Sequence, residues 1–281
     1  MFKNLKSLDL ASFTIMGSSI QAIFGFIIGI IVLIASTVIS KSFNYYTLIY
    51  PFLFAFTAFI IDIASYFISG GLFNLLSRKF SVNFDLDNGK VRDLSVLQIA
   101  IISAIATAVI LILVYPIFAL IFGSLSSLGA FLMYMPVLYA LYYVSMIFAN
   151  PLYLVGIVAM TFVLTAIFVF LYNQISLKVR AIELDLSEIH GNRTQINSIN
   201  PLSIALPISI VSLIIGLIIA IVNSLYMTNV LTALFSILSA VVTTFISTFI
   251  IAYLAALLYN FMVNKGILGP ITIKLEDVSD E

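Results

Sequence analysis

The feature that most constrains this chain is a set of six long, almost uninterrupted apolar stretches. A helix needs about 20 predominantly apolar residues to cross the hydrocarbon core of a bilayer. The six stretches cover residues 13–36, 50–70, 97–123, 152–172, 204–221 and 230–258. Because each is close to that length or longer, they predict six transmembrane helices.

The composition agrees with lipid as the solvent for most of the chain. Of the 281 residues, 63% are hydrophobic and only 9% are charged. A soluble domain carries about 25% charged residues, because its surface faces water. The absence of cysteine excludes disulfides, thiolate metal sites and a cysteine nucleophile. The formal net charge is zero, so we expect no basic surface for nucleic acid or for anionic lipid.

The apolar stretches fall into three tandem repeats, residues 1–89, 90–190 and 191–281. In each repeat a serine precedes the first stretch, and an aromatic residue followed by asparagine ends the second. The serines are Ser12, Ser95 and Ser203, and the asparagines are Asn74, Asn173 and Asn260. A serine hydroxyl at a helix N-cap accepts a hydrogen bond from the first turn, and aromatic rings favour the membrane interface. Each repeat is therefore predicted to contain a transmembrane helical hairpin.

A short segment of alternating apolar and polar residues follows each asparagine. The three segments are residues 82–87, 182–187 and 271–276. Such alternation is typical of a half-buried strand, and three strands with a shared apolar face can support one another. The predicted fold is thus an all-α polytopic membrane protein with a small three-stranded cytoplasmic sheet. An open edge of that sheet would offer a docking surface for another protein's strand.

The placement of basic residues predicts the orientation in the membrane. Of the twelve Lys and Arg residues, eleven lie before the first stretch, in the polar segments that join one hairpin to the next, or after the last stretch, and only Lys41 lies at a hairpin tip. With two spans in each repeat, these eleven residues share one side of the membrane. Basic residues accumulate on the cytoplasmic side. We therefore expect six spans in the cell membrane, with both termini in the cytoplasm.

The second repeat contains an additional apolar segment, residues 128–149, which carries four tyrosines and Pro136. If this segment crossed the membrane, the third repeat would be inverted and its basic residues would lie outside. We therefore expect an interfacial or re-entrant helix on the outer side. A seventh span is the alternative.

One polar position recurs within the spans. Asp62, the only charged residue well inside a span, precedes Asn74 by twelve residues, and the same offset gives Thr161 and Thr248 in the other repeats. Intramembrane ionisable residues are functional by default, so one hypothesis is a cluster of these three side chains along a proton or cation path. The alternative is that the threonines bond within their own or a neighbouring helix, with Asp62 a protonated or paired acid.

The third repeat carries a family resemblance in three segments, Ile199-Asn200-Pro201-Leu202-Ser203, Leu258-Tyr259-Asn260 and Gly269-Pro270-Ile271-Thr272-Ile273-Lys274-Leu275-Glu276. It resembles a group of small, uncharacterised prokaryotic membrane proteins of archaeal type. These look like single hairpins with an I-x-P-x-S start and a closing G-G-I-x-I-x-L-E strand. Here Pro270 replaces the second glycine, and the first two repeats match only in outline. The resemblance implies the hairpin-plus-strand unit and implies no activity.

Two classes of function remain after the motifs are considered. The sequence shows no phosphate-binding glycine loop, no nucleophile with a base and no set of metal ligands, so we expect no enzyme activity, cofactor or metal. The apolar spans favour a scaffold or accessory subunit that contacts lipid and a protein partner, or a second copy, through its helices or strands. The alternative is a small-solute or ion transporter or channel that uses Asp62, Thr161 and Thr248.

Overall fold

The computed structural model describes residues 2–42, 45–127, 136–189, 192–227 and 229–277. The chain divides into two compact units. The barrel unit comprises residues 1–95 and 168–281, and the helical unit comprises residues 96–167. All six of the described strands belong to the barrel unit.

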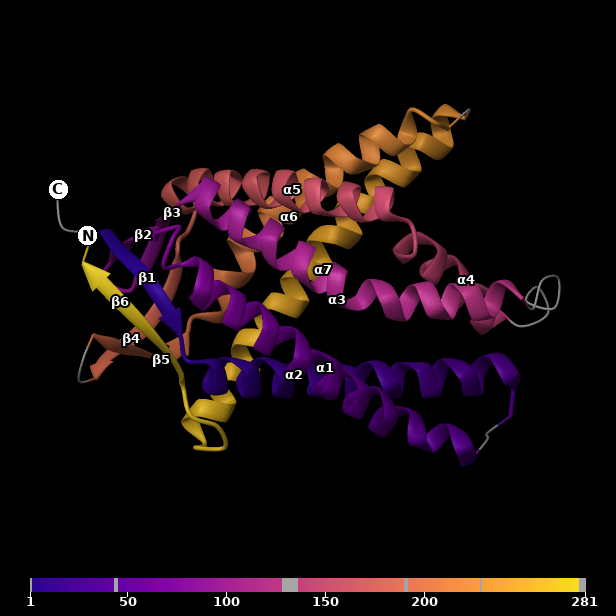
Figure 1. The fold of residues 1–281 in the computed structure, drawn as a ribbon, viewed down its shortest axis with the longest axis horizontal. Helices are drawn as coiled ribbons and strands as arrows, with labels where there is room; N and C mark the ends of the chain where they lie inside the picture. Colours follow the sequence, from indigo (N-terminus) through magenta and orange to yellow (C-terminus); the bar gives the residue numbers. More distant parts are fainter. Residues whose placement is uncertain (1, 43–44, 128–135, 190–191, 228, 278–281) are drawn as a thin grey trace. The chain divides into compact units, whose positions relative to one another are not determined.

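Each repeat begins and ends with a strand and has two long helices between them (Figure 1). The first contains β1 (Phe2–Leu8), α1 (Leu10–Ser40), α2 (Tyr50–Leu76) and β2 (Val82–Asp87), with a short 3-10 helix, η1 (Tyr45–Ile49), before α2. The second contains β3 (Lys90–Leu94), α3 (Val96–Ser126), α4 (Pro136–Phe148), α5 (Pro151–Lys178) and β4 (Ile182–Ile189). The third contains β5 (Arg193–Ile199), α6 (Pro201–Ser224), α7 (Val230–Asn264) and β6 (Ile271–Asp277).

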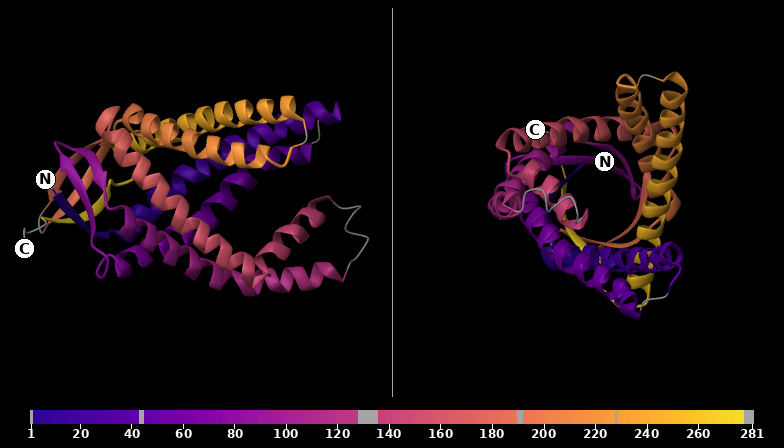
Figure 2. Two further views of the ribbon diagram at one scale, coloured as in Figure 1. Left: turned by 90° about the horizontal axis from the view of Figure 1, so that it is seen from above. Right: turned by 90° about the vertical axis from the view of Figure 1, so that its right-hand side faces the viewer.

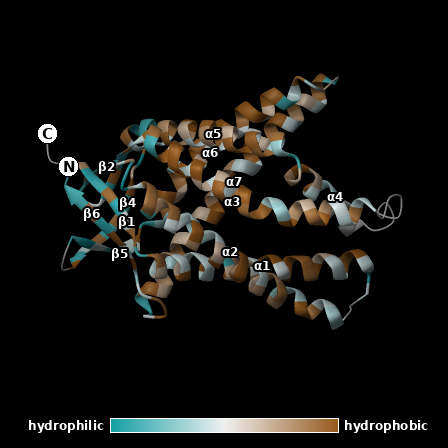
Figure 3. Cartoon of the chain, viewed as in Figure 1, coloured by the Kyte–Doolittle hydropathy of each residue, from teal (hydrophilic) through white to brown (hydrophobic). Residues whose placement is uncertain are grey.

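Six helices of the described chain are long and apolar enough to cross a membrane, as the sequence predicted. They are α1, α2, α3, α5, α6 and α7. Most extend beyond the predicted apolar stretches, because a helix continues through polar residues such as Asn74 that end an apolar run. Figure 3 shows that these helices are mainly hydrophobic, whereas hydrophilic residues gather on the strands.

The strands form a closed antiparallel barrel in the order β1-β2-β3-β4-β5-β6 (Figure 2). Within the three repeats the equivalent register pairs are Leu5 with Val82, Val91 with Ile182, and Ile196 with Ile271. The ring closes where β1 pairs with β6, for example Lys3 opposite Asp277. The chain is mainly helical, as predicted, but the prediction of a small three-stranded sheet in an otherwise all-α chain is wrong. The three expected strands exist, but β1, β3 and β5 join them, and the closed barrel leaves no open edge.

The barrel interior is filled by apolar side chains. Phe84, Val91, Ile273 and Leu275 are buried there. Partly buried residues packed around them are Leu5, Leu8, Leu86, Leu94, Ile182, Leu184, Ile196 and Ile271. Because alternate strand residues face opposite sides, the intervening polar and charged residues lie outside. The barrel thus encloses an apolar core.

The turn between β2 and β3 is made by Asn88 and Gly89, whose φ values of 49° and 77° are both positive. A two-residue hairpin with positive φ at both positions favours Asn-Gly. Gly89 is required for a second reason, since an added Cβ would overlap the carbonyl oxygen of Leu184 on β4. The Leu184 amide also donates to the Gly89 carbonyl at 2.8 Å. This turn therefore helps to join the first and second repeats.

Glycines allow α1 and α2 to pack closely in the barrel unit. A Cβ added at Gly25 would lie 2.7 Å from the Phe54 carbonyl oxygen, and one added at Gly29 would overlap the Pro51 backbone. Small residues spaced four apart let membrane helices approach each other in this way. The α6–α7 pair is less tight, since a Cβ at Gly216 would meet the Thr244 side chain at 3.1 Å or more.

In the helical unit, α4 packs against α3 through aromatic rings. Phe118 stacks on Phe148 at a centroid distance of 4.7 Å, and Phe122 stacks on Tyr142 at 5.3 Å. The helix α4 has 13 residues, or about 20 Å, which is shorter than the roughly 30 Å hydrocarbon core. Residues 128–135 of the predicted interfacial segment lie outside the described residues. The helix that is described is too short for a seventh span.

Candidate functional site

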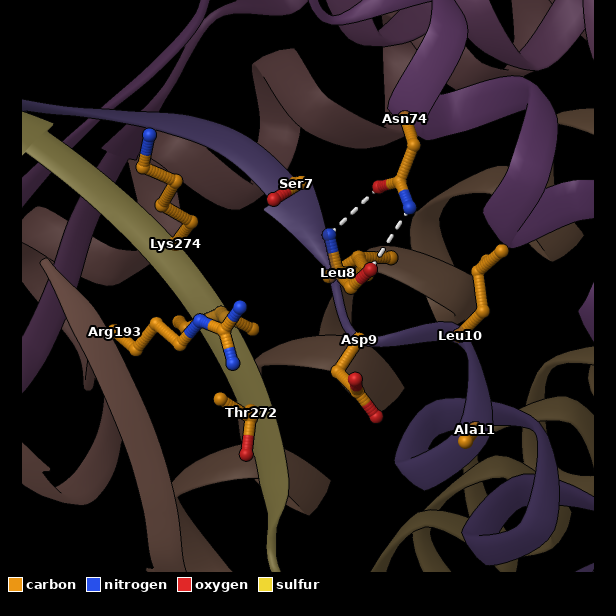
Figure 4. A pocket seen from close by; sticks show the side chains of 10 residues that line it. Ser7, Leu8, Asp9, Leu10, Ala11, Asn74, Arg193, Thr272 and Lys274 are labelled. Carbon is orange, nitrogen blue, oxygen red and sulfur yellow. Dashed lines mark hydrogen bonds between the residues drawn. The ribbon is translucent and has the colours of Figure 1, made fainter. Parts of the chain in front are cut away.

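The three repeat-marking asparagines make the same contact at the junctions between strands and helices. Each side-chain amide hydrogen bonds to both the N–H and the carbonyl of the last residue in the first strand of its repeat. The pairs are Asn74 with Leu8 (2.7 and 2.8 Å), Asn173 with Leu94 (3.0 and 2.8 Å) and Asn260 with Ile199 (2.8 and 2.7 Å). Figure 4 shows the two bonds of Asn74. The amide pairs with the strand end as a further peptide group would, and so fixes the second helix to the barrel.

The three serines join neighbouring repeats in a ring. Each hydroxyl oxygen accepts from the amide of the second residue in the preceding repeat's closing strand. The pairs are Ser12 with Thr272 (3.2 Å), Ser95 with Asn83 (3.1 Å) and Ser203 with Glu183 (2.9 Å). The first repeat accepts from the third, so the pattern closes with the barrel.

The predicted N-cap role of serine is wrong for the first and third repeats. The N-caps are Asp9 for α1, which accepts from the Ser12 amide at 2.8 Å, and Asn200 for α6. Ser12 and Ser203 lie in the first helical turn, whereas Ser95 immediately precedes α3. Ser95 therefore corresponds to Asp9 and Asn200, which lie three residues before Ser12 and Ser203. A short carboxylate or amide serves as an N-cap as well as serine does.

Two tyrosines complete the junctions through hydrogen bonds, whereas the sequence predicted only an aromatic ring at the membrane interface in these places. The buried Tyr172 hydroxyl donates to the Val91 carbonyl at 2.6 Å and accepts from the Ile182 amide at 3.3 Å. Tyr259 donates in the same way to Ile196 and accepts from Ile271 at 3.1 Å. The first repeat has Phe73 in this place, with no hydroxyl. The signal was present as an aromatic residue before each asparagine.

Glu183 connects three elements of the second and third repeats. Its carboxylate accepts from Asn200 at 2.7 Å and from Arg180 at 3.2 Å, and lies 3.7 Å from the Lys90 ammonium. Partial burial opposes ionisation of this carboxyl, but the hydrogen bonds and charges of Arg180, Asn200 and Lys90 outweigh it and lower its pKa below the ordinary value. The ionised carboxylate therefore stabilises the start of β4 and the N-cap of α6.

Asp62 lies in a groove of about 480 Å³ between α1 and α2. The other polar residues lining it are Gln21 and Thr57. Gln21 donates to the Tyr66 hydroxyl at 3.4 Å, one helical turn beyond Asp62. Among the described residues Asp62 has no hydrogen-bond or ion-pair partner. The groove therefore presents an unpaired carboxyl near the middle of a span.

The two threonines at the equivalent position have different surroundings. Thr248 lines a separate groove of about 410 Å³ between α6 and α7, together with Ser212, Gly216 and Thr244. Thr161, in the helical unit, donates to the Ile157 carbonyl of its own helix at 2.8 Å. The structure does not bring Asp62 and Thr248 into one cluster. Thr161 bonds to the backbone of its own helix, which is the alternative stated in the sequence analysis.

The fold defines a class of protein with six candidate spans and a closed barrel formed by the ends of three repeats. Comparison of the chain with protein families, curated proteins and solved structures finds no match. The function is therefore inferred from the residues and contacts of this structure alone. Described residues contain no group of three or more His, Cys, Asp or Glu side chains arranged to hold a metal ion.

Proposed function

We propose that the chain is a non-catalytic scaffold or accessory subunit of a membrane complex, in which the barrel holds three transmembrane hairpins. The hydrogen bonds that fix the hairpins to the barrel support this role. So do the apolar side chains, such as Phe84 and Ile273, that are packed inside the barrel. The observation that carries the proposal is the unpaired Asp62 in the α1–α2 groove.

The orientation we propose has both termini and the barrel in the cytoplasm and the hairpins in the cell membrane. Eleven of the twelve basic residues lie on the barrel, or on the helix ends and loops that join it. The twelfth, Lys41, is the left-handed C-cap at the far end of α1. Because basic residues accumulate on the cytoplasmic side, this separation supports a cytoplasmic barrel.

The partner that fits the α1–α2 groove is a transmembrane helix of another protein. An ionisable group within a membrane is costly unless it is paired, and Asp62 lies near the middle of the 27-residue helix α2. The groove rim is apolar and exposed, with Ile61 61% exposed and Leu53 51% exposed. A helix carrying a Lys, an Arg or a hydrogen-bond donor at the same depth would pair the carboxyl and cover this rim. A second copy would bring another carboxylate, which fits less well.

Site-specific photocrosslinking in native membranes tests this proposal. A photoreactive residue is placed at Ile61, on the groove, or at Phe56, which is 66% exposed on α2 but does not line the groove. We expect one protein adduct from position 61 and none from position 56. The adduct should disappear when Asp62→Leu is combined with the probe and persist with Thr161→Val. Equal adducts from both positions, adducts to lipid alone, or an adduct of two copies of this chain would contradict the proposal.

The transporter remains a second candidate because Asp62 could bind a proton. Reconstitution of the purified chain into vesicles separates the two functions. A scaffold gives no proton or cation flux above that of empty vesicles. Flux that is lost in Asp62→Asn, with the fold retained, would support the transporter and contradict the scaffold.

A further inference from the structure

The barrel has three equivalent seams, where the closing strand of one repeat lies beside the first strand of the next. They are the β2–β3, β4–β5 and β6–β1 seams. The fourth residue of the closing strand is Asp85 at the first, Asp185 at the second and Lys274 at the third. Its register partners are Asp93, Ser198 and Ser7, respectively. Two seams thus carry acids at this position, and the β6–β1 seam carries a base.

A second cation lies beside Lys274 on the outside of the barrel. Arg193 of β5 is its direct register partner across the β5–β6 pair. Like charges directly opposite each other on neighbouring strands are destabilising. In the first repeat, the equivalent partners are Phe2 and Asp85. The two opposed cations therefore favour an anion between them.

The seam is hollowed around these cations (Figure 4). A groove of about 360 Å³ is lined by Arg193 and Lys274 together with Ser7, Asp9, Asn74 and Thr272 among others. An adjoining groove of about 440 Å³ shares Ser7, Asn74 and Lys274 with it and adds Lys6, Arg78 and Glu276. We call the two together the basic seam. Their polar walls are built from strands, the start of α1 and the end of α2.

The charges of the basic seam are not balanced within the described chain. Glu276 is shared by two lysines, at 3.1 Å from Lys274 and 3.8 Å from Lys6. Asp9 is engaged in capping α1. Arg78 and Arg193 have no carboxylate partner among the described residues. Four cations therefore face two carboxylates.

With α1 as a membrane span, the basic seam lies at the level of the lipid headgroups. Its wall includes Leu10, the first residue of α1. The 31 residues of α1 give a length of about 46 Å, which exceeds the roughly 30 Å hydrocarbon core and reaches into the headgroup layers. Basic groups at this depth attract anionic lipids.

We propose that the basic seam binds the phosphate headgroup of one anionic phospholipid. Arg193 and Lys274 contact the phosphate oxygens, because guanidinium and ammonium donors form charge-assisted bonds with phosphate. Ser7 and Thr272 offer hydroxyl donors beside them. This site is independent of the partner helix proposed above, since it lies on the barrel rather than between the spans.

Native mass spectrometry of the full chain in detergent, titrated with phosphatidylglycerol or phosphatidylcholine, tests the site. We expect one molecule of phosphatidylglycerol to bind preferentially. Each cation near a membrane contributes about fivefold in affinity, so Arg193→Gln with Lys274→Gln should weaken binding about thirtyfold. The matched control, Lys178→Gln with Lys265→Gln, removes two basic residues at other helix ends and should change the affinity less than twofold.

Three outcomes would overturn the proposal. One is equal weakening in both double variants, which indicates attraction by overall charge. Another is unchanged binding in the Arg193 and Lys274 variant. The third is binding of soluble glycerol phosphate as tight as that of the lipid, which indicates a site for a free solute. If the double variant does not fold, the single Arg193→Gln variant, which breaks no ion pair of the described chain, should still lose about fivefold.

Discussion

The junctions of the barrel and the hairpins that leave it follow different rules. At the junctions, all three repeats use the same asparagine and serine contacts, at distances between 2.7 and 3.2 Å. In the spans the repeats diverge, with a glycine-packed α1–α2 pair, a Thr244 contact in α6–α7 and an additional helix after α3. The repeated pattern is therefore a hydrogen-bonding requirement of the barrel. Side chains in the spans are free to differ, because their backbone bonds are satisfied within each helix.

The largest expected effect is on stability, and it distinguishes the tightly packed α1–α2 hairpin from the α6–α7 hairpin. Gly29→Ala places a Cβ in the Pro51 backbone, and overpacking of this kind costs about 3 kcal/mol. Thermal unfolding in detergent micelles should show a lower midpoint, with earlier proteolysis of the α1–α2 loop. Gly71→Ala is the control, because an added Cβ there has nothing within 4 Å. Equal stability of the two variants would contradict the proposed glycine packing.

The next effect tests whether the three junctions are equivalent. Asn260→Leu leaves the N–H and carbonyl of Ile199 without their partner, and a buried unsatisfied group costs about 1–3 kcal/mol. Asn74→Leu and Asn173→Leu should lower the free energy of unfolding by similar amounts. Denaturant titration of the three variants, with the exposed Asn223→Leu of α6 as a control, makes the comparison. A large effect in one repeat only would show that the junctions are not equivalent.

A smaller effect distinguishes the second and third repeats from the first. Tyr172→Phe and Tyr259→Phe each remove a hydroxyl that connects two strands. A hydrogen bond of this kind contributes about 1 kcal/mol. Amide hydrogen exchange should increase at Ile182 and Ile271, which lose their acceptor. Tyr226→Phe, at an 85% exposed side chain, should leave both amides unchanged.

The smallest expected effect is on the pH dependence of the free energy of unfolding. The folded-state pKa of Glu183 is lowered, so its contribution is complete above the unfolded value and is lost as pH falls through the folded pKa. The exposed charge pairs limit the effect to less than about 1 kcal/mol. Unfolding measured between pH 7 and pH 3 should show a weaker pH dependence in Glu183→Gln than in the parent chain. An identical pH profile would show that ionisation of Glu183 does not contribute to barrel stability.

The sequence predicted the helices and the closing strands because each has a local period. The alternation in Val82–Asp87 and Ile271–Asp277 identified β2 and β6 almost to the residue. The first strands were missed because they run directly into helices and are interrupted by irregular register, as between Leu5 and Ser7. Closure of the barrel could not be predicted either, since β1 and β6 are far apart in the sequence. Local sequence periodicity does not indicate which distant strands will pair.

For the candidate site, repetition located residues without revealing their contacts. A preceding aromatic residue marked the three asparagines, but it did not show that each amide binds the end of a strand. A shared offset of twelve residues before the asparagine matched Asp62 with Thr248, which the structure separates into two grooves. A shared offset fixes the height of a residue along its helix, whereas the hairpins decide which neighbours it meets.

Pairing of β1 with β6 has a consequence for biogenesis. The ring is complete only when the last strand has left the ribosome, by which time all six candidate spans have been made. Until then one side of β1 is unpaired, and the barrel cannot close before the third hairpin has been made. Because the start of β1 lies beside the end of β6, a permutant opened at the Asn88-Gly89 turn, with a short linker from β6 to β1, would form the same ring in a different order of synthesis.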